Sequence, residues 1–153
     1  MPTSERLRAF VALDLPDETR AAITDWVTGA ARGRDDVRAV AADALHVTLA
    51  FLGHISAPDA DRAGALVTDL APSCVAADLE PGAITAVPRR RPRLFALETG
   101  DPSGAASRLQ DALAGALSVE GIYQPEDRAF WPHVTVARVR RCLLYTSPSP
   151  RDS

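Results

Sequence analysis

His46-Val47-Thr48-Leu49-Ala50 and His133-Val134-Thr135-Val136-Ala137 are two copies of one short pattern. The chain has three histidines, and two of them begin these copies. In each copy a threonine follows two residues after the histidine, and the remaining residues are β-branched or aliphatic. Short apolar runs rich in valine and threonine favour an extended backbone. The sequence therefore predicts that each copy is a β-strand.

Alternation along a strand gives each copy two different faces. Because successive side chains point to opposite sides, His46 and Thr48 share one face, with Cα atoms about 6 to 7 Å apart. Val47, Leu49 and Phe51 are expected to point the other way, into a core. The second copy repeats this arrangement. Each copy thus offers one imidazole and one hydroxyl to a common surface.

Two imidazoles on one surface are suited to phosphoester chemistry near neutral pH. One imidazole can accept a proton while the other donates one, and two hydroxyls can hold the non-bridging oxygens of a phosphate. A single His-x-Thr pattern is a weak signal, because a lone histidine is more often a satisfied structural residue. Two copies inside a larger repeat are a much stronger signal.

The resemblance between the two halves of the chain extends upstream of the histidines. Residues 8–14 (RAFVALD) resemble residues 93–98 (RLFALE), and each segment is followed by a turn and a helix-like stretch. A repeat of this kind predicts two versions of strand, helix and catalytic strand. A pseudo-twofold relation between them would bring the two His-x-Thr patterns face to face.

Composition sets the broad class. With 153 residues, 46% of them hydrophobic, the chain suits one compact domain or a two-lobed one. Its net charge of -3 predicts no general attraction to nucleic acid. All 17 basic residues are arginine, which excludes the covalent lysyl-nucleotide mechanism of ATP-dependent ligases and Schiff-base chemistry. Near the amino terminus only residues 9–13 form an apolar run, so we expect no signal peptide and no membrane span, and a cytoplasmic location.

The rest of the sequence predicts an α+β fold of short strands and three helices. Helices are expected at 16–31, 58–70 and 102–117. In the first of these, the helical spacing of apolar residues predicts that Trp26 is buried. Strands without regular βαβ alternation favour the α+β class. The predicted strands are at 7–15, 37–40, 45–52, 75–79, 83–87, 93–97 and 131–138.

Three segments carry a resemblance to a known family: 8–16 (RAFVALDLP), 44–53 (ALHVTLAFLG) and 132–138 (PHVTVAR). Over residues 6 to about 140 the chain resembles the two-histidine phosphoesterases, specifically the LigT-like RNA 2′,3′-cyclic phosphodiesterases. This implies a two-lobed fold in which antiparallel sheets line a central cleft and helices lie outside. It also implies hydrolysis of a 2′,3′-cyclic phosphate to a 2′-phosphate without metal or cofactor, and in some members reversible 2′-5′ ligation of RNA ends. The implied partners are RNA ends or nucleotides that bear the cyclic phosphate, and a monomer is expected.

The resemblance also implies roles for individual residues. His46 would donate a proton to the departing 3′ oxygen, and His133 would accept a proton from the attacking water. Thr48 and Thr135 would bind the phosphate; the sequence by itself shows only a pair of histidines and leaves open which is the acid. Arg138 would be a further phosphate contact, although strict alternation puts it on the face opposite Thr135 unless a bulge intervenes.

Other polar residues near the two patterns have simpler interpretations. His54 is expected on the surface. A metal site would combine the two pattern histidines with a third ligand such as His54 or Asp43, but the sequence shows no recognisable spacing of zinc ligands, so no metal is expected. Residues 89–93 (RRRPR) form the basic cluster of the chain. They would either contact a nucleic-acid backbone or form a charged loop, and the loop is slightly favoured.

The aromatic pair Phe130-Trp131 precedes the second pattern directly. Either side chain could stack on a base, but packing in the core is the favoured interpretation.

Two functional alternatives to the cyclic phosphodiesterase also stay open. One is a nucleotide-binding or RNA-end-binding module that does not turn over, and the other is a phosphodiesterase for a small cyclic nucleotide or an ADP-ribose cyclic phosphate.

The carboxyl-terminal segment 142–152 (CLLYTSPSPRD) resembles a translated sequencing adapter read through from a truncated gene. The phosphoesterase domain is therefore expected to comprise residues 1–141, and residues 142–153 a non-native tail. Cys74 and Cys142 are expected to be free thiols. Relatives continue beyond the second pattern, so we expect strands to be missing at the carboxyl end and an unpaired sheet edge beside the catalytic strand.

Overall fold

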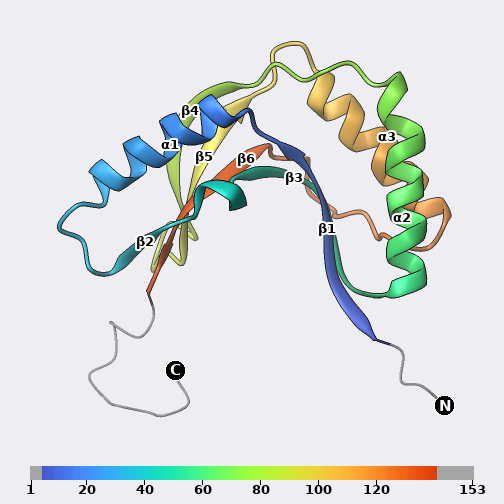
Figure 1. Ribbon diagram of the computed structural model, residues 1–153, viewed down its shortest axis with the longest axis horizontal. Helices are drawn as coiled ribbons and strands as arrows, with labels where there is room; N and C mark the ends of the chain where they lie inside the picture. The colour runs from blue at the N-terminus through green and yellow to red at the C-terminus, as the bar shows by residue number, and fades with distance from the viewer. Residues whose placement is uncertain (1–4, 141–153) are drawn as a thin grey trace. The chain divides into compact units, whose positions relative to one another are not determined.

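The structure is a computed structural model that describes residues 5–140; the predictions made for residues 141–153 lie outside this range. Three α-helices and a sheet make up the described chain (Figure 1). The helices are α1 (Asp17–Ala30), α2 (Ala57–Leu70) and α3 (Ala105–Val119), and short 3-10 turns, η1 (Ala42–Ala44) and η2 (Ala71–Ser73), precede β3 and follow α2. The strands are β1 (Arg6–Asp14), β2 (Val37–Ala39), β3 (His46–Ser56), β4 (Glu80–Val87), β5 (Leu94–Gly100) and β6 (His133–Val139).

The two pattern strands are neighbours in the hydrogen-bonding order of the sheet. That order is β1-β3-β6-β5-β4, and β2 pairs with β6. The pairings of β6 with β2, β3 and β5 are all antiparallel. The predicted α+β class is confirmed. The expectation of an unpaired edge beside the second pattern is wrong, because β6 has β2 and β3 on one side and β5 on the other.

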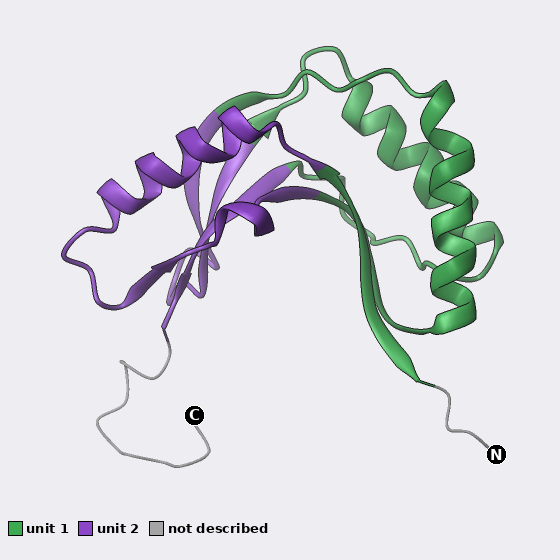
Figure 2. Ribbon diagram, in the orientation of Figure 1, with its two compact units in different colours: residues 1–13, 48–81, 99–132 green, residues 14–47, 82–98, 133–153 purple. Residues whose placement is uncertain are grey.

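The chain forms two compact units, and each unit draws on three separate segments (Figure 2). Within the described residues, unit 1 comprises residues 5–13, 48–81 and 99–132, and unit 2 comprises residues 14–47, 82–98 and 133–140. The units therefore interleave along the sequence and do not coincide with its two repeated halves. The histidines of both patterns belong to unit 2.

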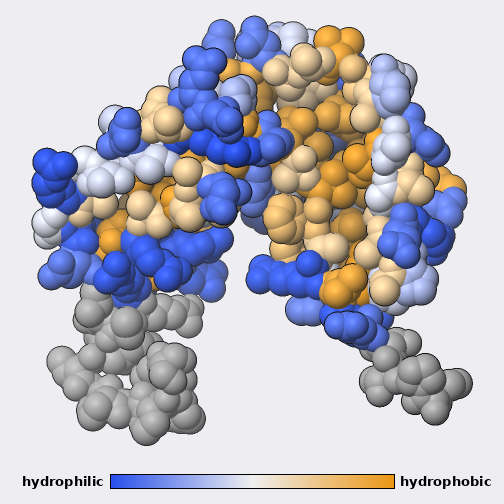
Figure 3. Space-filling view, in the orientation of Figure 1, coloured by the Kyte–Doolittle hydropathy of each residue, from blue (hydrophilic) through white to orange (hydrophobic). Residues whose placement is uncertain are grey.

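In unit 1, α2 and α3 pack against each other. Ser56 caps α2, since its hydroxyl accepts a hydrogen bond from the backbone N–H of Asp59 at 3.2 Å. Arg62 of α2 binds the carboxylate of Glu120, just beyond α3, at 2.7 Å. Figure 3 shows apolar residues gathered over the part of this unit where β1 and α2 lie. The core cluster consists of Leu49, Ala50, Ile55, Ala63, Leu113, Leu117 and Ile122.

In unit 2, α1 packs on β2 and β6. It begins directly after Pro16 and carries acidic residues in its first turn, as helix amino termini favour. Val27 is its buried residue, whereas Trp26 is 56% exposed. The prediction that Trp26 is buried is wrong, because the stripe of α1 that meets the sheet is narrow and Val27 occupies it.

The predicted strand at 75–79 is also wrong. These residues form no regular element, and the strand in this region, β4, begins at Glu80. Val75 is 72% exposed, so its β-branched side chain has no core to pack against. None of the helices formed by the described residues is both long and apolar enough to cross a lipid bilayer.

Candidate active site

Strands β3 and β6 meet at the first apolar residue of each pattern. Val47 is the register partner of Val134 in this antiparallel pair. Continuing the register by one residue sets His46 opposite Thr135, so the first histidine lies beside the second threonine. Val47 and Val134 are 0% and 1% exposed, while His46 and Thr135 are half-buried. The predicted division into a core face and a polar face is confirmed for these residues.

A bulge in β6 decides which face Arg138 occupies. Residues 98, 96 and 94 of β5 are the register partners of His133, Thr135 and Arg138, in that order. These three β5 residues alternate without interruption, so they share one face, and their partners share it too. The register shifts between Phe95 and Ala96, which leaves Val136 as the extra residue of β6. Arg138 therefore lies on the same face as the second histidine and threonine, as the resemblance required.

The pattern of buried and exposed residues along β6 shows the same interruption of alternation. Val136 and Ala137 are consecutive and both buried, and the following Arg138 is exposed. Strand β3 has the same sequence of burial, since Leu49 and Ala50 are buried and Phe51 is 47% exposed. The prediction that Phe51 points into the core is therefore wrong. Instead, the guanidinium of Arg8 lies 5.1 Å from the centroid of the Phe51 ring, which is a cation–π contact.

Sequence reasoning missed Arg38 as a residue of this face. Arg38 of β2 is the register partner of Arg138, so the two side chains share a face. Both are exposed. A signal was present, because an arginine between the apolar Val37 and Ala39 in a predicted strand must point away from the core. What the sequence did not contain was the identity of the strand that β2 joins.

Glu98 is the second residue that sequence reasoning missed. It is the register partner of His133 and so lies beside that histidine on the polar face. The hydroxyl of Thr85 on β4 donates a hydrogen bond to its carboxylate, which fixes the position of the charge. In the sequence Glu98 only ends a repeated strand segment, and its neighbour on β6 is 35 residues away.

The imidazole of His46 is positioned by the turn that precedes β3. It is hydrogen-bonded to the backbone of Ala44, the last residue of η1. Burial lowers the pKa of His46 from its ordinary value, and the hydrogen bond to Ala44 opposes this shift without cancelling it. The neutral imidazole is therefore favoured in the free protein near neutral pH.

Thr48 is the one predicted residue that belongs to unit 1, because the division between the units falls after Val47. It lies two residues from His46 along β3 and is half-buried like the histidine. Alternation puts both side chains on one face of the strand. Within unit 2 the structure brings together His46, His133, Thr135 and Arg138, the other four predicted residues.

The remaining expectations have mixed outcomes. His54 is exposed, as expected, and its backbone carbonyl accepts a hydrogen bond from Arg6 at 2.6 Å. Residues 89–93 lie in the connection between β4 and β5, a position that fits either interpretation of this basic cluster. Phe130 packs against the core of unit 1, but Trp131 is 39% exposed, so the core interpretation is wrong for Trp131.

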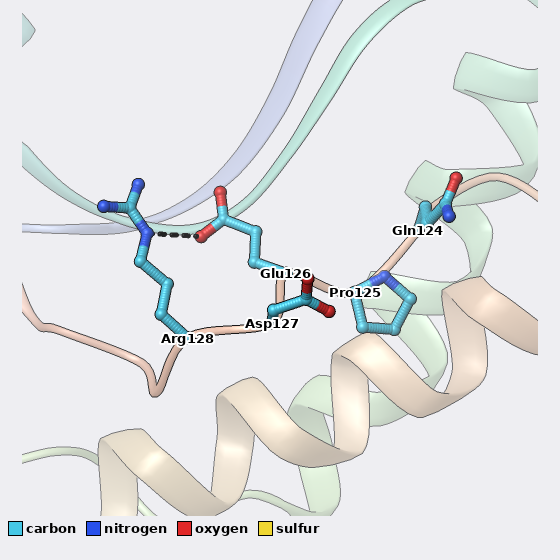
Figure 4. Close-up of a pocket in the computed structure, with 5 residues that line it drawn as sticks. All are labelled: Gln124, Pro125, Glu126, Asp127 and Arg128. Atoms are coloured by element: carbon cyan, nitrogen blue, oxygen red, sulfur yellow. Dashed lines mark ion pairs between the residues drawn. The ribbon is translucent and has the colours of Figure 1, made fainter.

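Two further features of the described residues bear on ligand binding. Among residues 5–140 no three histidine, cysteine or acidic side chains come together as a metal site would require. An open hollow of about 690 Å³ lies along residues 124–128 of unit 1 (Figure 4). It carries Glu126, Asp127 and Arg128, with Glu126 and Arg128 paired at 3.6 Å. Two carboxylates against one guanidinium disfavour a phosphate there, and none of the predicted site residues lines it.

Comparison with known proteins identifies the family. The family model described as the 2′-5′ RNA ligase superfamily matches residues 15–141, a range that contains both patterns. The chain belongs to this superfamily. Two proteins of known name are similar to it. The RNA 2′,3′-cyclic phosphodiesterase of Escherichia coli strain K12 is 33% identical over 135 residues, which cover 88% of this chain and 73% of that protein. An Aeropyrum pernix protein of the same name is 32% identical over 97 residues, which cover 63% of this chain and 53% of the relative.

Solved structures agree with the assignment to the 2′-5′ RNA ligase superfamily. E. coli LigT complexed with 3′-AMP superimposes with a TM-score of 0.70 at 30% identity, and the match covers 88% of this chain and 74% of LigT. The Thermus thermophilus protein TT0787 superimposes with a TM-score of 0.73 at 27% identity, over 95% and 78% of the two chains. The resemblance to LigT-like proteins that the three sequence segments carried is confirmed.

Proposed function

We propose that this chain hydrolyses the 2′,3′-cyclic phosphate at an RNA 3′ end to a 2′-phosphate, with His46 and His133 as acid and base. The observation that carries the proposal is the register of β3 and β6, which makes the two histidines diagonal neighbours across one pair of strands. Diagonal cross-strand neighbours have Cα atoms about 7 to 8 Å apart. That separation leaves room for one phosphate between the two imidazoles. The names of the similar proteins point to the same reaction.

The reaction needs one group on each side of the phosphorus. His133 accepts a proton from a water molecule as the water oxygen bonds to phosphorus. The bond from phosphorus to the 3′ oxygen breaks, and His46 donates a proton to that oxygen. Thr48 and Thr135 donate hydrogen bonds to the non-bridging oxygens, and Arg138 offsets their negative charge. The product carries a 2′-phosphomonoester and a free 3′-hydroxyl.

The lowered pKa of His46 fits a role that begins when substrate binds. A neutral imidazole next to an arriving phosphate gains an anionic neighbour, and an anion favours the protonated ring. His46 then carries the proton that it donates to the 3′ oxygen. If a 5′-hydroxyl of a second RNA end replaces water, the same groups form a 2′-5′ linkage, which is the reverse of cleaving one.

Several finer points belong to the proposal. The expected substrate is an RNA end rather than a small cyclic nucleotide, and the reaction is expected to need no metal or cofactor. A pure binding module has no use for an acid and a base placed one phosphate apart, so turnover is favoured over binding alone. We also propose that the protein is a monomer and acts in the cytoplasm. The phosphoesterase domain is taken to be residues 1–141, as the sequence predicts.

The proposal is tested by replacing each histidine in turn. His46→Ala and His133→Ala are each expected to lower kcat on adenosine 2′,3′-cyclic phosphate by about 10² to 10⁴, as loss of a positioned acid or base does. His54→Ala is the matched control, because His54 is an exposed histidine eight residues further along β3. Full activity in both active-site variants would overturn the proposal. So would an equal loss in His54→Ala.

A further inference from the structure

We propose that Arg38 and Arg138 together form a subsite for a second phosphate, namely the internucleotide phosphodiester that precedes the cyclic phosphate in an RNA chain. This inference rests on the proposed function and names the class of substrate: an oligoribonucleotide end rather than a mononucleotide. Arg138 was expected to contact phosphate; the new elements are Arg38 and the second phosphate.

The first observation is that the two arginines face each other. They are register partners in the antiparallel pair of β2 and β6, so their Cβ atoms are about 4.5 to 5.5 Å apart. Like charges in this arrangement destabilise a sheet. Two arginines that are this close at Cβ can both reach one anion, since each guanidinium can donate parallel hydrogen bonds to phosphate oxygens.

The second observation is that this charge is not neutralised within the described chain. Several other arginines have carboxylate partners: Arg20 pairs with Asp14, Arg34 with Asp36 and Arg62 with Glu120. Across residues 5–140, the side chains of Arg38 and Arg138 form neither an ion pair nor a hydrogen bond, and both are exposed. A repulsive pair without an internal counter-charge is therefore open to an external anion.

The third observation is the distance to the proposed catalytic phosphate. Thr135 lies opposite residue 96 of β5, and Arg138 lies opposite residue 94. Along the polar face, the positions of Thr135 and Arg138 are thus separated by the length of two β5 residues, about 7 Å. Neighbouring phosphates of an extended RNA strand have a comparable separation. One phosphate at Thr135 and His46 therefore sets the next one at Arg138 and Arg38.

The charge along β6 also gives the RNA a direction. Glu98 lies beside His133 at one end of the polar face, and the arginine pair lies at the other end. A phosphodiester is repelled at the Glu98 end and attracted at the Arg38 end. Leu94, the register partner of Arg138 on β5, lies beside the arginine pair and carries no carboxylate that would compete with a phosphate.

The test compares a one-phosphate and a two-phosphate substrate: adenosine 2′,3′-cyclic phosphate and the dinucleotide ApA with a 2′,3′-cyclic phosphate. The kcat/KM of the dinucleotide divided by that of the mononucleotide measures the benefit of the second phosphate. Arg38→Gln is expected to lower this ratio by about tenfold, the effect of losing one exposed charge-assisted contact. The salt dependence of dinucleotide binding should also weaken, by about 0.7 in the slope of log K against log salt for one single-strand phosphate contact.

Arg32→Gln is the matched control. Arg32 is an exposed arginine of the same unit, in the loop after α1, and its loss changes the net charge equally. The wild-type ratio is expected to persist in this variant. An unchanged ratio in Arg38→Gln, or an equal fall in Arg32→Gln, overturns the subsite.

Calorimetric binding separates failure of the subsite from failure of the proposed function. The wild type and Arg38→Gln are titrated with 3′-AMP and with ApA bearing a 3′-phosphate, neither of which needs turnover. A selective loss of dinucleotide affinity in Arg38→Gln supports the subsite even if the wild type hydrolyses neither cyclic phosphate. Equal affinities of the two proteins for the dinucleotide overturn it. A third ligand, adenosine 3′,5′-bisphosphate, carries its second phosphate as a monoester. If Arg38→Gln weakens the binding of this ligand but not that of the dinucleotide, the assignment to an RNA chain is overturned.

Discussion

Two neighbouring residues of β6, Ala137 and Arg138, are predicted to respond in opposite ways to the same substitution. The bulge at Val136 puts Ala137 on the core face and Arg138 on the polar face. Strict alternation from His133 would reverse these positions. Ala137→Asp and Arg138→Asp therefore test the bulge, and with it the composition of the active-site face.

The magnitudes follow from the surroundings of each residue. Ala137 is 4% exposed and lies between Ala39 of β2 and Phe95 of β5, where an added carboxylate has no partner. An uncompensated buried charge costs about 3 to 5 kcal/mol, a large part of the about 5 to 15 kcal/mol by which a domain is stable. Arg138→Asp instead puts a carboxylate opposite Arg38 and removes a like-charge pair. It should leave stability unchanged or raise it by about 0.2 to 1 kcal/mol.

The assay is urea denaturation followed by circular dichroism, together with thermal melting. A loss of 3 kcal/mol or more lowers the Tm of a chain of this length by about 6 °C or more. Ala137→Asp should show such a loss, and Arg138→Asp should melt at or above the wild-type temperature. Both should have reduced activity, Ala137→Asp because it is destabilised and Arg138→Asp because it repels phosphate. A stable Ala137→Asp and a strongly destabilised Arg138→Asp would refute the bulge and the face assigned to Arg138.

The remaining predictions concern the chemistry of the site. Burial lowers the pKa of His46, and His46 must be protonated to act as the acid. The alkaline limb of the pH profile of kcat/KM should therefore lie below the ordinary histidine value of about 6.5. A limb well above 6.5 would contradict the assignment of His46. Glu98→Gln should lower kcat about tenfold and change KM little, because the carboxylate beside His133 stabilises the imidazolium that forms during the reaction; steady-state kinetics showing a changed KM alone would argue against this role. Thr135→Val keeps the shape of the side chain and removes its hydroxyl, so kcat/KM should fall about tenfold or more while the urea midpoint stays within error of the wild type.

The sequence predicted those features of the site that depend on one strand at a time. Alternation was enough to put Val47 and Val134 on the face opposite the two histidines. The repeated pattern was enough to predict that both strands contribute side chains to one surface. The bulge at Val136 could not be predicted, because an extra residue is defined only against the register of β5. Without that register the face of Arg138 was undetermined.

Arg38 and Glu98 were missed for a related reason. Each joins the site through a strand that is distant in sequence, and the local pattern around each does not reveal the partner strand. The predictions for Trp26 and Phe51 were wrong for a different reason, since the apolar character of these side chains was taken as a sign of burial. Large aromatic side chains at the margin of a packed stripe stay exposed when smaller neighbours fill the core, as Val27 and Ala50 do.

In the proposed reaction, His46 donates its proton to the 3′ oxygen of a cyclic phosphate while His133 activates water. The most direct measurement is ³¹P NMR of the product formed from ApA ending in a 2′,3′-cyclic phosphate. We expect a single monoester resonance, that of the 2′-phosphate, which is absent when His46→Ala or His133→Ala replaces the wild type. A 3′-phosphate product, or a mixture of both isomers, would show that the two histidines do not have these roles.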